Sequence, residues 1–319
     1  MISAGIARHK VDWLWGINVS RALMNAIKEV TSKKVVLSAG RVQSPTLIHV
    51  VNTTVDRETY VPLPYYTISV EAVINKRKIK FTLDKVFENK EEAQKFAEKI
   101  RSDQIIVKEV NYEERNLTRP PPFNLGDLQV EAGRVLGLSP YYTERLAEEL
   151  YLDGLISYPR TNSQKIPATV NIDQIVQELE KNNFASLVKT VKNITKKERG
   201  FKVRQGEKED PAHPAIYPTG EKAKGLQLKT YKLYELIVRR FLASISADAR
   251  VKDQHVVLTF KNTEFKAKLS FQKVEFKGWL LIYPYRKVAD EEFLDTTEGE
   301  IGGLTKVSVS MKMSKPSQG

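Results

Sequence analysis

The chain has 319 residues, 41% of them hydrophobic and 28% charged, which is the composition of a globular protein of two or three domains. It contains no cysteine and no apolar stretch long enough to span a membrane, which excludes disulfides and thiolate zinc sites and predicts a cytoplasmic protein without membrane contact. The net charge of +12 favours an anionic partner such as nucleic acid, although a generally lysine-rich proteome is an alternative explanation.

The hydrophobic spacing predicts a helical start followed by a β region. Apolar residues recur at about one-turn intervals over residues 11–50, where the segment LSAGRVQSPT has the glycine and proline of a turn or helix start. Alternating apolar residues predict strands at Tyr66–Val73 and Ile79–Leu83. A helix with Asn89 as its N-cap and a strand at Ile105–Val110 are expected to follow.

Three consecutive prolines, Pro120–Pro122, interrupt this pattern, and they predict a stiff joint because they cannot continue a helix or a central strand. Beyond the joint the spacing becomes helical, and strand alternation returns at Phe265–Phe271. The predicted helices are Leu128–Leu136, Thr143–Leu152, Val170–Leu187 and Tyr231–Leu242. The simplest architecture is therefore a β region with a helical block inserted into it.

The segment GLISYPRTNS (Gly154–Ser163) places a tyrosine two residues before an arginine, after a glycine that is typical of a helix end. Phenols are largely protonated at neutral pH, so a tyrosine nucleophile needs support. The guanidinium of Arg160 could stabilise a Tyr158 phenolate and hold a phosphate through two parallel hydrogen bonds. The alternative is a packed ring beside a solvated charge, and this segment alone does not decide between the two.

Two further segments carry side chains that suit phosphate chemistry. In AHPAIYPTG, prolines surround His213 in a rigid loop, and a histidine can move a proton near neutral pH. In LSAGRVQS, the side chains of Arg41, Gln43 and Ser44 lie beside a helix start, where backbone amides favour phosphate. A loop histidine without a chemical role and a capping turn with a solvated arginine remain the alternatives.

Together and in this order, these segments resemble the type IA DNA topoisomerases. The resemblance rests on LSAGRVQSPT (37–46), PPFNLGDLQ after the proline joint (121–129), GLISYPRTNS (154–163) and AHPAIYPTG (212–220). The opening VDWLWGINVSRAL (11–23) also looks like the segment that follows the metal-binding domain in this family. The YPRT form and the high lysine content resemble the archaeal or topoisomerase III-like branch.

The resemblance implies a mixed α+β multidomain fold in which a β arch carries an inserted helical domain, as in the type IA topoisomerase torus. Residues 1–50 would be a helical DNA-groove segment of a domain that is completed elsewhere. Residues 51–119 and 246–300 would form the β arch, and residues 120–245 the helical domain with the nucleophilic tyrosine. Residues 301–319 would be a truncated return to the first domain.

The resemblance also implies roles for individual residues. Tyr158 would attack a DNA phosphodiester to give a 5′-phosphotyrosyl intermediate, Arg160 would bind the scissile phosphate, and His213 would assist in phosphate contact and proton transfer. Strand passage and rejoining would relax negatively supercoiled DNA through contacts with single-stranded DNA. The expected DNA-binding residues are Arg41, Gln43, Ser44, Thr161, Ser163 and Thr219.

Two departures from the family pattern limit these expectations. The family usually reads HEAIRPT where this chain has HPAIYPT, so Pro214 and Tyr217 replace a glutamate and an arginine. The acidic DxDxE cluster of the family's TOPRIM domain is not found either. We therefore expect a fragment without metal ligands and with impaired cleavage, for which Mg²⁺ and the TOPRIM domain are supplied elsewhere.

Two other functions are considered. A non-catalytic scaffold that binds single-stranded DNA is the alternative, and the presence of both Tyr158 and Arg160 favours the enzyme. A tyrosine recombinase or type IB enzyme places its tyrosine after an HxxR pair, whereas Tyr158 here precedes His213 and Ile216 occupies the arginine position. The sequence leaves open whether the chain derives from a topoisomerase I, a topoisomerase III or a reverse gyrase.

Overall fold

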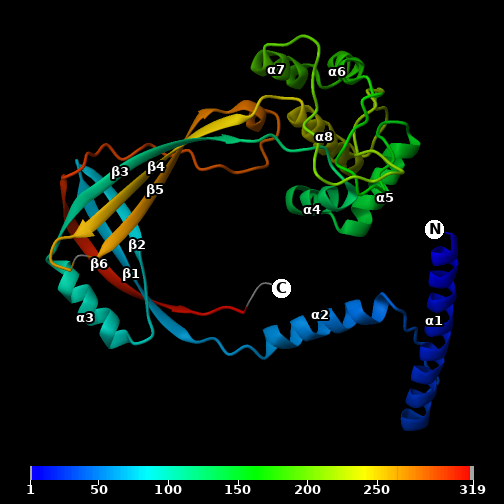
Figure 1. Ribbon diagram of the computed structural model, residues 1–319, viewed down its shortest axis with the longest axis horizontal. Coiled ribbons are helices and arrows are strands. Elements are labelled where there is room, and N and C mark those ends of the chain that lie inside the picture. Colours follow the sequence, from blue (N-terminus) through cyan, green and yellow to red (C-terminus); the bar gives the residue numbers. More distant parts are fainter. Residues whose placement is uncertain (1, 264, 317–319) are drawn as a thin grey trace. The chain divides into compact units, whose positions relative to one another are not determined.

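The computed structural model describes residues 2–263 and 265–316, which form helices and an antiparallel sheet (Figure 1). Contacts divide these residues into two compact units. The first unit comprises the chain up to Val70, Thr82–Arg101 and the chain from Lys306 onward; the second comprises Glu71–Phe81 and Ser102–Thr305. In the described part of the chain, no helix has the length and apolar character needed to cross a membrane.

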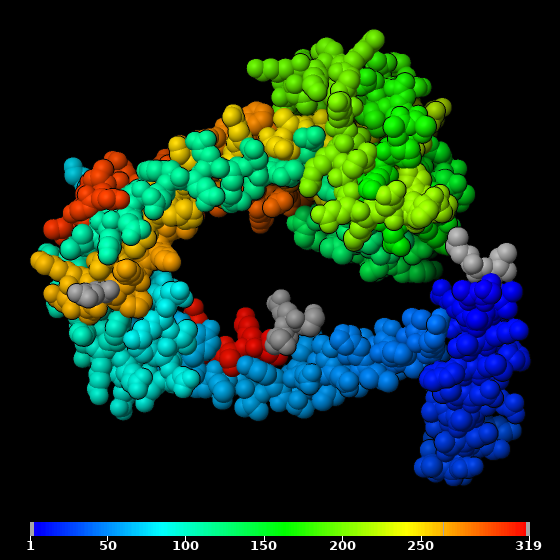
Figure 2. All heavy atoms as spheres, in the orientation of Figure 1, coloured from blue at the N-terminus to red at the C-terminus, as the bar shows by residue number. Residues whose placement is uncertain are grey.

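Three helices belong to the first unit, and two of them open the chain. Helix α1 (Ile2–Thr31) and helix α2 (Gln43–Glu58) are blue in Figure 2, and α2 has no buried residue. Helix α2 begins at the predicted helix start but runs past residue 50, because neither glycine nor proline occurs between Thr46 and Tyr60. The boundary that the sequence suggests between residues 50 and 51 therefore falls inside a helix.

Helix α3 (Lys90–Arg101) confirms the prediction of a helix that starts after Asn89. The Asn89 Oδ1 atom accepts a hydrogen bond of 2.8 Å from the Glu91 amide, which would otherwise lack a partner in the first turn. One face of α3, including Ala93, Ala97 and Ile100, is buried, as the spacing predicts.

The sheet has six strands in the order β2-β1-β6-β3-β4-β5. Their bounds are β1 (Pro64–Ile74), β2 (Arg77–Phe87), β3 (Gln104–Leu117), β4 (Ala249–Phe260), β5 (Lys266–Phe276) and β6 (Ile301–Met313). Strand β3 pairs antiparallel with β4 along nearly its whole length, and β4 pairs with β5, so that these three strands run side by side in Figure 1. The alternating residues that predicted β1, which are Ile68, Val70 and Ala72, are fully buried.

Strand β6 (Ile301–Met313) lies between β1 and β3. The return of residues 301–319 to the first domain stays a prediction, and the residues from Lys306 onward belong to the first unit. The Gly302-Gly303 pair hides this strand in the sequence, because glycine is a poor strand former. Close packing requires a glycine at position 302, since a Cβ atom there would meet Ile74 Cγ1 at 2.7 Å and Ile105 Cγ1 at 2.9 Å.

The residues between Leu117 and Ala249 contain the remaining α-helices. These are α4 (Leu125–Leu136), α5 (Pro140–Leu152), α6 (Ile172–Lys181), α7 (Ala185–Thr195) and α8 (Leu228–Ser244). The prediction of one helix over Val170–Leu187 is wrong, because the chain is extended at Asn182. The Asn182 Nδ2 atom donates a hydrogen bond to the Gly220 carbonyl and holds this break in place.

Helix α8 is the centre of the helix cluster α4–α8, which is green to yellow in Figure 2. It contacts α4, α5, α7 and the short 3₁₀ helix η1 (Gly278–Leu281). Its side chains Leu233, Ile237 and Phe241 are buried in the core. Leu155, Ile156 and Ile216 from the loops lie in the same core, so the loops that carry the tyrosine and histidine motifs are anchored to it.

Candidate active site

Backbone hydrogen bonds join the tyrosine motif to the histidine motif. The Ser157 amide donates to the Tyr217 carbonyl at 2.9 Å, and the Thr219 amide donates to the Leu155 carbonyl at 3.0 Å. A third segment joins them, because the Ile216 amide donates to the Phe123 carbonyl at 2.8 Å. Backbone hydrogen bonds therefore hold side by side segments that are more than 50 positions apart in the sequence.

The side chain of Ser157 adds a second connection between the two motifs. Its Oγ atom donates to the Ala215 carbonyl at 2.9 Å and accepts from the Tyr217 amide at 3.0 Å. Both ends of this connection lie directly beside the predicted site residues, because Ser157 precedes Tyr158 and Ala215 is two residues after His213. The hydroxyl thus fixes the spacing between the tyrosine and the histidine.

The half-buried ring of Tyr158 lies between two aromatic side chains. Its centroid is 4.6 Å from that of His213, with a tilt of 50°, and 5.3 Å from that of Tyr151, which meets it edge-on. Edge-on and tilted contacts at these distances are favourable for aromatic pairs. The two neighbours restrict the orientation of the Tyr158 ring and keep an imidazole beside the phenol.

Arg160 is exposed and is held by two carboxylates of helix α5. Its Nε atom lies 3.0 Å from Glu144 Oε1, and its Nη2 atom lies 3.2 Å from Glu148 Oε2. Exposed ion pairs of this kind contribute at most about 1 kcal/mol, so the guanidinium can exchange a carboxylate for another anion at low cost. The arginine is held against α5 without being locked.

The sequence reasoning missed Glu144, Glu148 and Tyr151. These residues follow i, i+4, i+7 spacing and therefore share one face of α5. That helix is predicted correctly from its apolar residues, and the signal for the missing site residues was the composition of its opposite, polar face.

Thr161 and Ser163, for which the sequence predicts DNA contact, have buried side chains. Thr161 Oγ1 donates to the His213 carbonyl at 3.1 Å and accepts from the Ser163 amide at 3.0 Å. Ser163 Oγ accepts from the Lys165 amide at 3.1 Å. Thr219 is exposed, and its Oγ1 atom donates to the Gly154 carbonyl at 2.7 Å. These hydroxyls shape the loops around the tyrosine.

A carboxylate missed by the sequence reasoning lies beside the histidine. The Ala212 amide, at 2.9 Å from Asp210 Oδ1, holds the pKa of Asp210 below its usual value, and the charge of His213 acts in the same direction. A cavity of about 380 Å³ opens next to this pair. Its lining includes Lys165, Gln205, Asp210 and His213, so it presents both charged and neutral hydrogen-bonding groups.

The remaining predicted site residues, Arg41, Gln43 and Ser44, belong to the first unit. The Arg41 Nε atom lies 2.7 Å from Asp12 Oδ1 on α1, and Ser44 Oγ accepts from the Gly40 amide at 3.2 Å. Gln43 Oε1 accepts a hydrogen bond from Ser38. The side chains of Arg41 and Gln43 are exposed.

The described residues show no cluster of metal-binding side chains. No group of three or more histidine, aspartate or glutamate side chains is placed there so that it could hold a metal ion. Mg²⁺ prefers near-octahedral oxygen coordination, usually with one or two carboxylates. Two carboxylates of α5, Glu144 and Glu148, are engaged with Arg160.

Comparison with known proteins gives one consistent result. Residues 1–318 match a family model described as DNA topoisomerase. The chain is 41% identical to DNA topoisomerase 1 of Aeropyrum pernix, and this match covers 99% of the chain and 47% of the relative. It is 36% identical to DNA topoisomerase 1 of Methanothermobacter thermautotrophicus, and this match covers 99% of the chain and 43% of the relative. The structure of full-length topoisomerase I from Thermotoga maritima superposes with a TM-score of 0.73 at 26% identity, over 99% of this chain and 51% of that one.

The chain thus spans about half the length of the relatives it matches. The match covers both the sheet and the helix cluster, and the mixed α/β fold agrees with that of the solved relative. These two relatives are archaeal, which agrees with the resemblance to the archaeal branch. On these grounds the chain belongs to the type IA DNA topoisomerase family.

Proposed function

We propose that this chain supplies the tyrosine-bearing part of a topoisomerase that cuts one DNA strand, allows strand passage and rejoins the cut. The observation that carries this proposal is the position of Tyr158, whose ring lies against His213 while Arg160 occupies the next exposed position of the same loop. Nucleophile, proton acceptor and phosphate-binding cation are thereby grouped, as phosphoryl transfer to a phenol requires.

In the proposed reaction, the Tyr158 oxygen attacks the phosphorus of a DNA phosphodiester and its proton passes to His213. A bond forms between the phenol oxygen and the 5′-phosphate, and the bond to the 3′-oxygen breaks. The leaving 3′-oxygen takes a proton from an acid of the TOPRIM domain, which would be supplied elsewhere. Arg160 holds the non-bridging phosphate oxygens through charge-assisted hydrogen bonds. Rejoining is the reverse reaction, with the 3′-hydroxyl as nucleophile.

The proposed DNA contacts use exposed side chains. Arg41, Gln43 and Thr219 are exposed and carry groups that bind phosphate. Ser44 follows Arg41 and Gln43 at the start of α2. We assign Thr161 and Ser163 a positioning role, because their hydroxyls are used within the loops. Single-stranded segments of negatively supercoiled DNA are the proposed substrate.

We further propose the domain division expected from the sequence, which is a β arch with an inserted helical domain. Its support is the position of Pro120–Pro122, since β3 ends at Leu117 and α4 begins at Leu125. The described residues place no cluster of three or more metal-binding side chains. We therefore propose that Mg²⁺ and the TOPRIM domain come from outside these residues. When bound, the ion would supply charge stabilisation during strand rejoining.

Covalent trapping tests the proposal. The chain is incubated with a 3′-labelled single-stranded oligonucleotide, with and without the TOPRIM domain in trans, and then denatured. A labelled adduct is expected for the parent chain and no adduct for Tyr158→Phe. The matched control is Tyr151→Phe, which removes a hydroxyl from the neighbouring ring and should retain the adduct.

A non-catalytic scaffold that binds single-stranded DNA is the second candidate, since the exposed side chains of Arg41 and Gln43 could serve such binding without cleavage. Salt-sensitive binding without any adduct, both alone and with the TOPRIM domain, would support the scaffold and contradict the enzyme. An adduct that persists in Tyr158→Phe would contradict the assignment of the nucleophile.

A further inference from the structure

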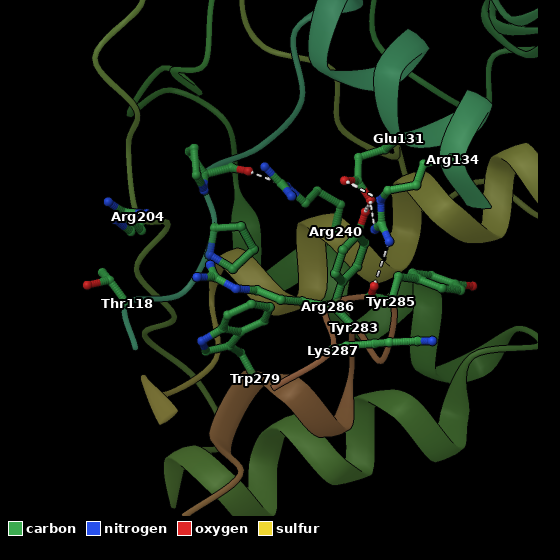
Figure 3. Close-up of a pocket in the computed structure, with 12 residues that line it drawn as sticks. Thr118, Glu131, Arg134, Arg204, Arg240, Trp279, Tyr283, Tyr285, Arg286 and Lys287 are labelled. Atoms are coloured by element: carbon green, nitrogen blue, oxygen red, sulfur yellow. Dashed lines mark hydrogen bonds and ion pairs between the residues drawn. The ribbon is translucent and has the colours of Figure 1, made fainter. Parts of the chain in front are cut away.

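A second cavity, of about 500 Å³, lies at the proline joint and is distinct from the one beside His213. Its walls come from the joint itself, from α4, from α8 and from the segment that follows η1 (Figure 3). Cavities of this size are typical of small-molecule sites. Its ionisable lining residues, apart from two tyrosines, are Glu131, Arg134, Arg204, Arg240, Arg286 and Lys287.

The single carboxylate of this cavity is already neutralised. Glu131 Oε2 lies 2.6 Å from Arg134 Nη2 and accepts a further hydrogen bond of 2.8 Å from the Tyr283 hydroxyl. Burial raises the pKa of Tyr283, so the phenol stays protonated and acts as the donor. Arg134 is thus the one cation of the group whose charge is matched inside the cavity.

The other four cations have no carboxylate within ion-pair distance in the part of the chain that the structure describes. Arg204 donates to the Arg119 carbonyl, and Arg240 Nε donates to the Pro121 carbonyl at 2.7 Å. Arg240 also packs over the rings of Phe123 and Tyr283, at 4.6 and 5.5 Å. These contacts leave several guanidinium donors of each arginine unused.

Arg240 is the most constrained of these cations. Burial lowers its pKa, because part of the hydration of the guanidinium is lost, and the charges of Glu131 and Asp127 offset this loss only in part. A partly buried cation is costly unless it is paired, and arginine remains charged at physiological pH. The cavity therefore has an excess of positive charge, with four arginines and a lysine against the single carboxylate of Glu131.

The cations are spread along the cavity. Arg286 extends over the Trp279 ring, 5.9 Å from its centroid, toward the proline joint, whereas Lys287 extends in the opposite direction beneath Tyr285 (Figure 3). A single small anion would reach only one end. A ligand with two or more phosphates, a few ångströms apart, would reach several of these groups at once.

We propose that this cavity binds a nucleotide ligand that carries at least two phosphates, with Arg240, Arg286 and Lys287 as its main contacts. The ligand is either a segment of a DNA strand or a free nucleoside polyphosphate. Guanidinium groups bind phosphate oxygens through paired hydrogen bonds, and Tyr285 provides an aromatic group near the rim on which a base can stack. The site does not depend on the proposed cleavage reaction.

Trp279 lines the cavity and provides a specific readout. The chain contains three tryptophans, so a Trp13→Phe, Trp15→Phe background leaves Trp279 as the single emitter. In this background we would titrate inorganic triphosphate, adenosine triphosphate and a thymidylate pentamer, and follow the emission at low and moderate salt. Saturable changes that weaken with salt are expected.

The test variant is Arg286→Gln with Lys287→Gln, since both side chains are exposed and their loss should not disturb folding. At least tenfold weaker binding is expected. The control is Lys99→Gln with Arg101→Gln, which removes two exposed cations from α3 and should change affinity less than twofold. Tyr158→Phe should bind like the parent, which separates this site from the proposed nucleophile.

The three probes distinguish the sources of the phosphates. Selective loss of pentamer binding in the test variant would identify a DNA strand as the ligand, and selective loss of adenosine triphosphate binding would identify a free nucleotide. Loss of both would show that the phosphates alone are recognised. Equal affinities in the test and control variants, or no change of Trp279 emission with any probe, would overturn the proposal.

Discussion

Replacing Ser157 with alanine should loosen the connection between the tyrosine and histidine loops. The hydroxyl makes one hydrogen bond as donor, to the Ala215 carbonyl, and one as acceptor, from the Tyr217 amide. A typical internal hydrogen bond contributes about 1 kcal/mol. Because both protein partners are left without the hydroxyl in the variant, we expect a local loss of about 2 kcal/mol, or about thirtyfold in the opening equilibrium.

Amide hydrogen exchange at Tyr217 measures this loss directly, because its amide is the group that donates to Ser157 Oγ. Protection of this amide should fall by about thirtyfold in Ser157→Ala. Protection of amides in α6 should stay constant. Ser186→Ala, at an exposed position of α7, is the matched control. A change of less than about threefold at Tyr217 would refute the claim that the hydroxyl joins the two loops.

Three other perturbations test separate parts of the structure. Glu144→Gln with Glu148→Gln should change the free energy of unfolding by less than about 1 kcal/mol but strengthen DNA binding at low salt, because Arg160 is freed. Fluorescence anisotropy measures the DNA affinity, and weaker binding by the variant would contradict the prediction. Gly278→Ala should lower the melting temperature markedly in calorimetry, since the φ of Gly278 is +46° and a Cβ atom would meet the Asp248 carbonyl oxygen at 2.6 Å. An unchanged melting temperature would contradict this packing. Burial alone would raise the pKa of Glu131, but hydrogen bonds from Arg134 and Tyr283 lower it below its usual value. The contribution of Glu131 to stability is therefore present above the usual pKa of a glutamate and is lost as the pH falls through the lowered pKa. Urea titrations should show a steeper loss of stability in acid for the parent than for Glu131→Gln, and parallel profiles would contradict the linkage.

Most helices and strands were predictable because their apolar residues follow a clear period. The alternation in β1 and the apolar face of α3 both describe a surface that is buried on one side only. The break between α6 and α7 was not predictable in this way, since apolar residues continue on both sides of Asn182. A tertiary hydrogen bond to Gly220 determines that break, and local spacing carries no information about it.

The tyrosine and histidine motifs were recognisable in the sequence, but their contact was not. Antiparallel bridges at Ile156–Pro218 and Phe123–Ile216 bring them together, and such pairings of short loops leave no periodic signal. The buried hydroxyls of Thr161 and Ser163 show the converse case. Their polarity suggested a ligand, whereas the loop backbone itself needed hydrogen-bonding partners.

The position of β6 has a consequence for the nascent chain. This strand is the last of the six to be synthesised, yet it lies between β1 and β3 in the sheet. Until it leaves the ribosome, the β1–β2 hairpin and the β3–β4–β5 group each keep an unpaired edge, and unpaired edges promote association between chains. Translation pauses that occur before β6 has left the ribosome should therefore increase aggregation, whereas pauses after it has emerged should not.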